Sequence, residues 1–183
     1  MMTQPNTLQE YSVHPATRMG HVSLTVASLE NQILFYEKAM GFKVHWREGN
    51  KAGLGAGGAD LLQFTEEPNL KRYQRTTGLY HFAILFPNRR ELAIAMARLF
   101  ALKVPNSPTD HVMTKTTYLS DPEGNGIELY CESPEDGSWT IKDGNYEARW
   151  ADGRWSDGRE ALDVDALFTH IKEDDRVDGS IPA

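Results

Sequence analysis

An internal repeat constrains the fold of this chain more than any other feature of its sequence. His21 and His81 lie 60 residues apart, and each opens a segment in which apolar residues alternate. Each is followed 23 residues later by a valine, Val44 or Val104, after a helix-capping residue, a stretch of helical apolar spacing and a turn. A repeat of this length indicates one supersecondary unit used twice. We therefore expect an α+β fold in which two βαβββ modules form a cupped mixed sheet and bury each other's apolar faces.

Changes in composition suggest where the modules begin and end. Residues 1–17 are polar, contain two prolines and are predicted to be an arm on the surface or on a neighbouring subunit. Residues 18–132 are predicted to form a single domain, and residues 133–183 a C-terminal extension whose tryptophans cover the domain or a partner subunit. Within the domain, the predicted parts are the first module at 18–66, a linker at 67–77 and the second module at 78–132.

Local signals mark the two helices. Ser28 and Asn88 are N-cap residue types that stand just before apolar residues at helical spacing, and Gly41 is suited to end the first helix. The strand after the second helix is predicted to begin at Lys103. Further along, a cluster of turn residues between Tyr118 and Cys131 predicts two strands joined by a tight reversal.

Charge and cysteine content narrow the function classes. The net charge of −7 argues against a nucleic-acid or anionic-membrane partner. The single cysteine, Cys131, excludes an intramolecular disulfide and fits a reducing compartment. The first residues lack the basic and apolar regions of a signal peptide, and no apolar run approaches the roughly 20 residues of a membrane span. We therefore expect a cytoplasmic protein without a membrane or nucleic-acid partner.

Glu128 is the residue that most directly suggests chemistry. It stands between Ile127 and Leu129 in a predicted strand, and a lone carboxylate in an apolar sheet is costly unless a positive group meets it. We expect a divalent metal there, with His21 and His81 completing the site. Two histidines and one carboxylate with open positions suit ferrous iron.

Gln63 is the first module's counterpart of Glu128, in Leu62-Gln63-Phe64. Two interpretations remain open for it. Its amide oxygen is a candidate fourth ligand, although a weaker one than a carboxylate, and otherwise it is a polar residue that lines the pocket.

Four segments resemble those of a known superfamily: GHVSLTV, FYEKAMGFKV, GLYHFAILFP and DHVMTKTTYLSDPEGNGIELY. They resemble the vicinal oxygen chelate superfamily of glyoxalases, bleomycin-resistance proteins and extradiol dioxygenases, and most of all its catechol-2,3-dioxygenase branch. The resemblance implies that fold, and an Fe(II) ion held by His21, His81 and Glu128, with Mn(II), Ni(II) and Zn(II) as alternatives. It also implies that Tyr118, ten residues before the glutamate, and His111, shortly before that tyrosine, are catalytic.

Interpretations without a catalytic role also stay open for Tyr118 and His111. Tyr118 is otherwise a packed aromatic side chain with its hydroxyl at the surface. His111 has an ordinary loop context, although its usual pKa range suits proton transfer.

Three functions follow from these expectations. The first is an extradiol-type dioxygenase that opens the ring of a small aromatic diol with O2. The second is a glyoxalase-like lyase or isomerase that uses Ni(II) or Zn(II). The third is a metal-free ligand-binding protein of the bleomycin-resistance type. Related extradiol enzymes usually carry two such domains in one chain, so we expect either a homodimer that completes the pocket or a loss of activity.

Overall fold

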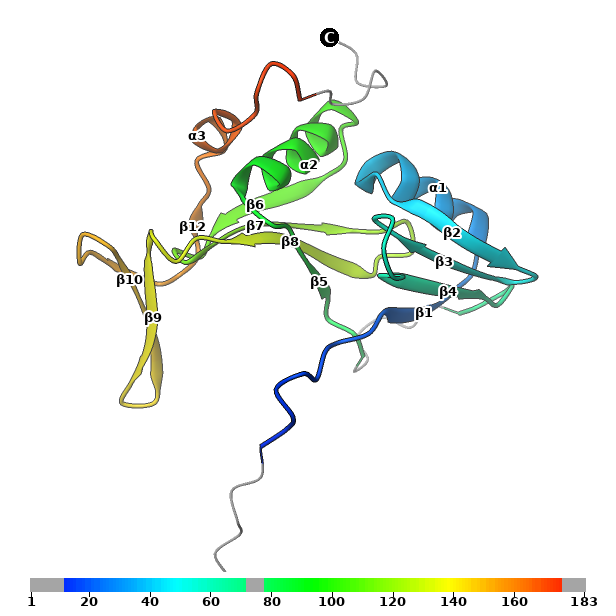
Figure 1. The fold of residues 1–183 in the computed structure, drawn as a ribbon, viewed down its shortest axis with the longest axis horizontal. Coiled ribbons are helices and arrows are strands. Elements are labelled where there is room, and N and C mark those ends of the chain that lie inside the picture. The colour runs from blue at the N-terminus through cyan, green and yellow to red at the C-terminus, as the bar shows by residue number, and fades with distance from the viewer. Residues whose placement is uncertain (1–11, 72–77, 176–183) are drawn as a thin grey trace, which may run out of the picture.

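A computed structural model describes residues 12–71 and 78–175, and shows the βαβββ unit twice (Figure 1). The first module comprises β1 (Val22–Val26), α1 (Leu29–Met40), β2 (Lys43–Glu48), β3 (Lys51–Gly55) and β4 (Leu62–Glu66). The second comprises β5 (Phe82–Leu85), α2 (Arg89–Ala101), β6 (Asn106–Asp110), β7 (Thr114–Ser120) and β8 (Gly126–Glu132). Most of the predicted arm, residues 72–77 of the predicted linker and the last eight residues of the extension lie outside the described residues.

The two modules form separate sheets of the same strand order. The first sheet runs β1-β4-β3-β2, and the second runs β5-β8-β7-β6, with the short strand β12 (Glu160–Ala161) added beside β6. In each module the first and last strands pair in parallel, with Ser23 opposite Gln63 and Ala83 opposite Glu128. Gln63 and Glu128 therefore occupy equivalent positions, as the repeat predicted. The strands β1 and β5 are edge strands of their sheets.

The predicted helix signals are found where expected, with one correction. The side chains of Ser28 and Asn88 accept hydrogen bonds from backbone N–H groups of the first helical turns. Gly41 ends α1 in the left-handed conformation, with φ of 71°. The prediction that a strand begins at Lys103 was wrong. Lys103 lies in the turn after α2, with φ of 56° and its N–H donating to the carbonyl of Phe100. The strand β6 begins at Asn106.

One hydrophobic core joins the two modules. The helices α1 and α2 contact each other, and their buried faces pack with the inner faces of both sheets. A polar contact also crosses between the modules. The carboxylate of Glu123, in the turn between β7 and β8, accepts hydrogen bonds from the backbone N–H groups of Ala27 and Ser28 at 2.8 and 3.1 Å. It therefore satisfies N–H groups at the start of α1 that the helix itself leaves free.

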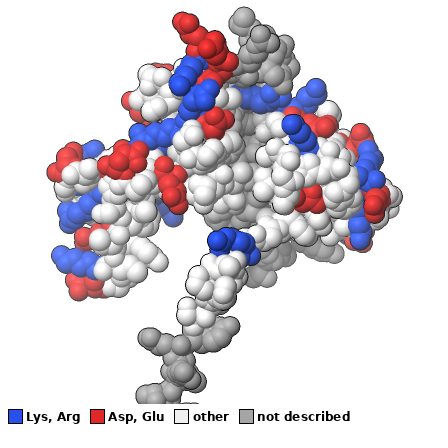
Figure 2. Space-filling view, in the orientation of Figure 1, with Lys and Arg blue, Asp and Glu red and all other residues white. Residues whose placement is uncertain are grey.

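The extension both packs on the second module and projects from it. Its helix α3 (Val164–Phe168) lies against α2, with Leu167 in the core. The strands β9 (Gly137–Lys142), β10 (Asn145–Trp150) and β11 (Trp155–Ser156) form a separate antiparallel sheet, which projects at the left of Figure 1. One face of its hairpin is apolar, with Trp139, Ile141 and Tyr146 on it, and charged side chains line its outer side in Figure 2.

Within residues 12–71 and 78–175, none of the three helices is long and apolar enough to cross a membrane.

Candidate functional site

Four of the six predicted site residues form one continuous chain of polar contacts on the second module. His81 Nε2 lies 3.0 Å from Glu128 Oε2. The hydroxyl of Tyr118 lies 2.9 Å from Glu128 Oε1 and 2.9 Å from His111 Nε2. All four side chains are partly exposed. The structure therefore brings together both proposed catalytic residues and two of the three proposed metal ligands.

Strand alternation explains why these side chains meet. On β8, Ile127 and Leu129 are fully buried, while Glu128 projects from the opposite, half-exposed face. Tyr118 lies directly opposite Glu128 in the antiparallel β7–β8 pair, so the two share that face. His81 immediately precedes β5, the parallel neighbour of β8. The predicted free-energy cost of placing the Glu128 carboxylate in this sheet is offset by its contacts with the His81 imidazole and the Tyr118 phenol.

The phenol of Tyr118, which contacts both His111 and Glu128, allows this series of contacts to transfer a proton. Burial, followed by the hydrogen bond to Glu128, raises the pKa of Tyr118, so its hydroxyl keeps one hydrogen. In one arrangement, His111 Nε2–H donates to the Tyr118 oxygen, and Tyr118 donates to the Glu128 carboxylate. In the other, a protonated Glu128 donates to Tyr118, and Tyr118 donates to a bare Nε2. These two arrangements differ by the transfer of one proton between His111 and Glu128, and the heavy-atom distances are compatible with both.

His21 is placed differently from the other proposed ligands. It is exposed and stands immediately before β1, at the position that His81 holds before β5. In the part of the chain that the structure describes, no three His, Cys, Asp or Glu side chains are grouped so as to hold a metal ion. The donor types of His21, His81 and Glu128 fit ferrous iron, whereas the described geometry gathers only the last two. The three-residue ligand set therefore stays a prediction.

Gln63 lies in a hydrogen-bond network that the sequence did not predict. Its Nε2 donates to Asp60 Oδ2 at 2.9 Å, and the same carboxylate contacts Trp46 Nε1 at 2.7 Å and His45 Nδ1 at 2.8 Å. The Trp46 hydrogen bond, followed by those of Gln63 and His45, lowers the pKa of Asp60. The contact with Asp60 anchors the amide nitrogen of Gln63, and Oε1 is the atom that this side chain can offer to a metal ion. The sequence feature that could have indicated this network is Asp60, an acidic residue three positions before Gln63.

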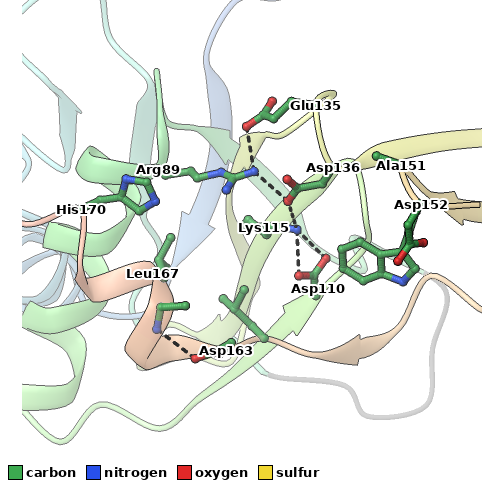
Figure 3. Close-up of a pocket in the computed structure, with 13 residues that line it drawn as sticks. Arg89, Asp110, Lys115, Glu135, Asp136, Ala151, Asp152, Asp163, Leu167 and His170 are labelled. Carbon is green, nitrogen blue, oxygen red and sulfur yellow. Dashed lines mark hydrogen bonds and ion pairs between the residues drawn. The ribbon is translucent and has the colours of Figure 1, made fainter. Parts of the chain in front are cut away.

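A charged cavity of about 430 Å³ lies beside the loop that carries His111 (Figure 3). None of the six predicted site residues lines it. Lys115 is almost fully buried in its wall, with Nζ 2.8 Å from Asp110 and 2.6 Å from Asp136. Asp136 also pairs with Arg89 at 2.7 Å. Asp110 accepts the backbone N–H of Val112 at 2.7 Å, so the same ion pairs support the His111 loop.

Comparisons with known proteins agree with this architecture. Residues 18–129 match the Glyoxalase/Bleomycin resistance protein/Dioxygenase superfamily. The catechol-2,3-dioxygenase of Bacillus subtilis (strain 168) is 41% identical over 138 residues, which are 74% of this chain and 48% of that protein. This chain therefore spans about half the length of that relative.

Solved structures share the fold. The lactoylglutathione lyase of Agrobacterium tumefaciens has a TM-score of 0.52 at 19% identity, over 64% of this chain and 96% of its own. A glyoxalase/bleomycin resistance protein/dioxygenase from Nocardioides has a TM-score of 0.51 at 20% identity, over 66% and 86% respectively. The predicted α+β fold of paired modules is confirmed.

Proposed function

This chain belongs to the glyoxalase/bleomycin resistance/dioxygenase superfamily, and from that premise we propose that it is a metal-dependent extradiol-type dioxygenase. Its substrates are a small catechol and O2, and the reaction opens the aromatic ring beside the two hydroxyls. The observation that carries the proposal is the chain of contacts His81–Glu128–Tyr118–His111. The relative named catechol-2,3-dioxygenase supports the same reaction class.

The proposed metal ligands are His21, His81 and Glu128, and Fe(II) is the proposed ion, with Mn(II), Ni(II) and Zn(II) as alternatives. When bound, the ion supplies open positions for the two vicinal oxygens of the substrate and for O2. His21 and His81 precede edge strands of different sheets, so this ligand set joins both modules. A homodimer in the cytoplasm, with a second copy completing the pocket, is the proposed assembly.

The chain's own residues orient the substrate and move protons. Tyr118 offers its hydroxyl to a substrate oxygen, and its raised pKa keeps it a neutral donor near pH 7. His111 takes up or gives up a proton at Nε2, the atom that faces Tyr118.

The decisive experiment measures metal content and oxygen uptake together. We expect anaerobically purified protein to retain Fe(II), and to consume O2 and form yellow ring-opened products with some members of a panel of catechols. His21→Ala and Glu128→Ala should lose both metal and activity, whereas the exposed His14→Ala should keep both. Iron-loaded protein that consumes no oxygen across the panel would overturn the proposal.

Gln63 favours one alternative, a glyoxalase-like lyase or isomerase with Ni(II) or Zn(II). Its register match with Glu128 gives the first module a potential fourth ligand. This alternative requires turnover of a 2-oxoaldehyde thiol adduct without O2, and loss of metal in Gln63→Ala. Metal retention by Gln63→Ala together with oxygen-dependent turnover would exclude it.

A further inference from the structure

The C-terminal extension holds His111 at two atoms. The backbone carbonyl of Gly158, in the turn between β11 and β12, contacts His111 Nδ1. The indole Nε1–H of Trp139, on β9, donates to the backbone carbonyl of His111 at 2.8 Å. Both contacts come from residues outside the paired modules, and Gly158 is 47 positions away from His111 in the chain. The extension therefore reaches the proposed acid–base residue directly.

The Gly158 contact determines which ring nitrogen carries a hydrogen. A carbonyl oxygen only accepts, so the hydrogen of this bond belongs to Nδ1. The other nitrogen, Nε2, then faces the Tyr118 hydroxyl at 2.9 Å and is the atom at which the proton is exchanged. We propose that Gly158 is a positioning residue, whose carbonyl fixes the Nδ1–H form of His111 and presents Nε2 to Tyr118. The catalytic consequence of this inference rests on the proposed function, but the assignment of the hydrogen does not.

The turn around Gly158 is built for this contact. Gly158 is buried with φ of 72°, a backbone conformation that a side chain strains. A Cβ at this position would lie 2.4 Å from the ring of Trp139, the residue that also binds the His111 carbonyl. The hydroxyl of Ser156, itself 2% exposed, accepts the Gly158 N–H at 3.0 Å and fixes the direction of the turn. Glycine is therefore required by both the backbone and the neighbouring ring.

The test is a long-range ¹H–¹⁵N correlation spectrum of the histidine rings, with His111 assigned by its loss in His111→Gln. In the wild type we expect neutral His111 to carry its hydrogen on Nδ1. Gly158→Ala should replace this pattern with a mixture of the two tautomers. Gly144→Ala is the matched control, because Gly144 also has a positive φ, of 80°, but lies in the exposed β9–β10 turn with open space around it. It should leave the His111 pattern unchanged.

The activity of the same variants tests the catalytic consequence. Gly158→Ala should lower kcat for ring opening by at least about tenfold, and the double variant with His111→Gln should be no slower than His111→Gln alone. Gly144→Ala should keep wild-type kcat. If Gly158→Ala does not fold, Ser156→Ala carries the test through the same two measurements.

Three results would overturn the inference: a hydrogen on Nε2 with a bare Nδ1 in the wild type, a folded Gly158→Ala with an unchanged His111 spectrum, or multiplicative losses in the double variant. If the wild type opens no catechol, the proposed function fails, while the spectra still decide the position of the hydrogen.

Discussion

At the scale of single residues, the site depends on a phenol placed between an imidazole and a carboxylate. The oxygen of Tyr118 is within hydrogen-bond distance of both His111 and Glu128, so its hydroxyl links the two side chains. The family resemblance, through a tyrosine ten residues before the glutamate, predicted that Tyr118 and Glu128 belong to one site. The same reasoning did not reveal that Tyr118 connects Glu128 to His111, since a side-chain contact from a loop has no sequence period.

Replacing Tyr118 by Phe keeps the aromatic ring and removes the hydroxyl that makes this link and faces the proposed substrate. We expect Tyr118→Phe to lower kcat for ring opening about a hundredfold, because proton exchange through the hydroxyl is lost. Its cost in stability should be only about 1 kcal/mol, the typical value of one hydrogen bond. Steady-state kinetics and urea unfolding measure the two effects. Tyr146→Phe, at a site that is 72% exposed, is the control, and an unchanged kcat in Tyr118→Phe would contradict this role.

A second tyrosine makes stability sensitive to alkaline pH. Burial, with the nearby charge of Asp121, raises the pKa of Tyr36, a fully buried residue of α1. The folded state therefore keeps a proton that the unfolded chain releases above its ordinary pKa of about 10. The stability from Tyr36 is fully present below about pH 10 and is lost as the pH rises further, because the unfolded state then binds fewer protons.

Urea unfolding midpoints between pH 8 and 11 measure this loss. Tyr36→Phe should flatten the fall above about pH 10, whereas Tyr146→Phe should leave it unchanged. A fall of equal steepness in Tyr36→Phe and the wild type would show that Tyr36 is not its source.

At the scale of helices and strands, the sequence predicted the order of elements far better than their contacts. The caps at Ser28 and Asn88 and the turn at Gly41 were predictable, because capping is a local property of the chain. The start of β6 was not predictable. The Lys103 side chain is compatible with a strand. At the end of α2, however, its backbone N–H donates to the carbonyl of Phe100, and this contact holds Lys103 in a turn.

Glu123 connects two elements that are distant in the sequence. Glu123→Ala should destabilise the protein by about 1–2 kcal/mol, because the N–H groups of Ala27 and Ser28 lose a charged acceptor at the start of α1. Glu37→Ala removes an exposed carboxylate from the same helix and should change stability by less than about 0.5 kcal/mol. Urea unfolding gives both values, and equal effects would argue against the capping role.

At the scale of the whole molecule, the extension is tied to the second module by buried charges. Its boundary near residue 133 stays a prediction, and its contacts with the His111 loop could not be predicted from the sequence, because they join segments far apart in the chain. Lys115, on β7, is 5% exposed and pairs with Asp110 of β6 and with Asp136 just before β9.

Lys115→Met removes the cation that pairs with Asp110 and leaves Asp136 paired with Arg89. It should cost about 3–5 kcal/mol, the usual penalty for removing one member of a buried ion pair. Proteolytic cleavage near residue 136 should also become faster, because the extension loses an attachment. Lys142→Met, at an exposed position on β9, is the control for loss of a lysine charge. Wild-type stability and proteolysis in Lys115→Met would contradict this account.

The two sheets each end in an edge strand that a histidine precedes, His21 before β1 and His81 before β5. An ion coordinated by both imidazoles would cross-link the two modules. Dissociation of the ion would then be coupled to separation of the modules. By thermodynamic linkage, the factor by which a bound ion strengthens the association of the modules equals the factor by which that association strengthens ion binding. A variant that weakens the contact between the modules should therefore raise the dissociation constant of the ion. The affinity for the proposed ion would thus measure how strongly the two modules associate.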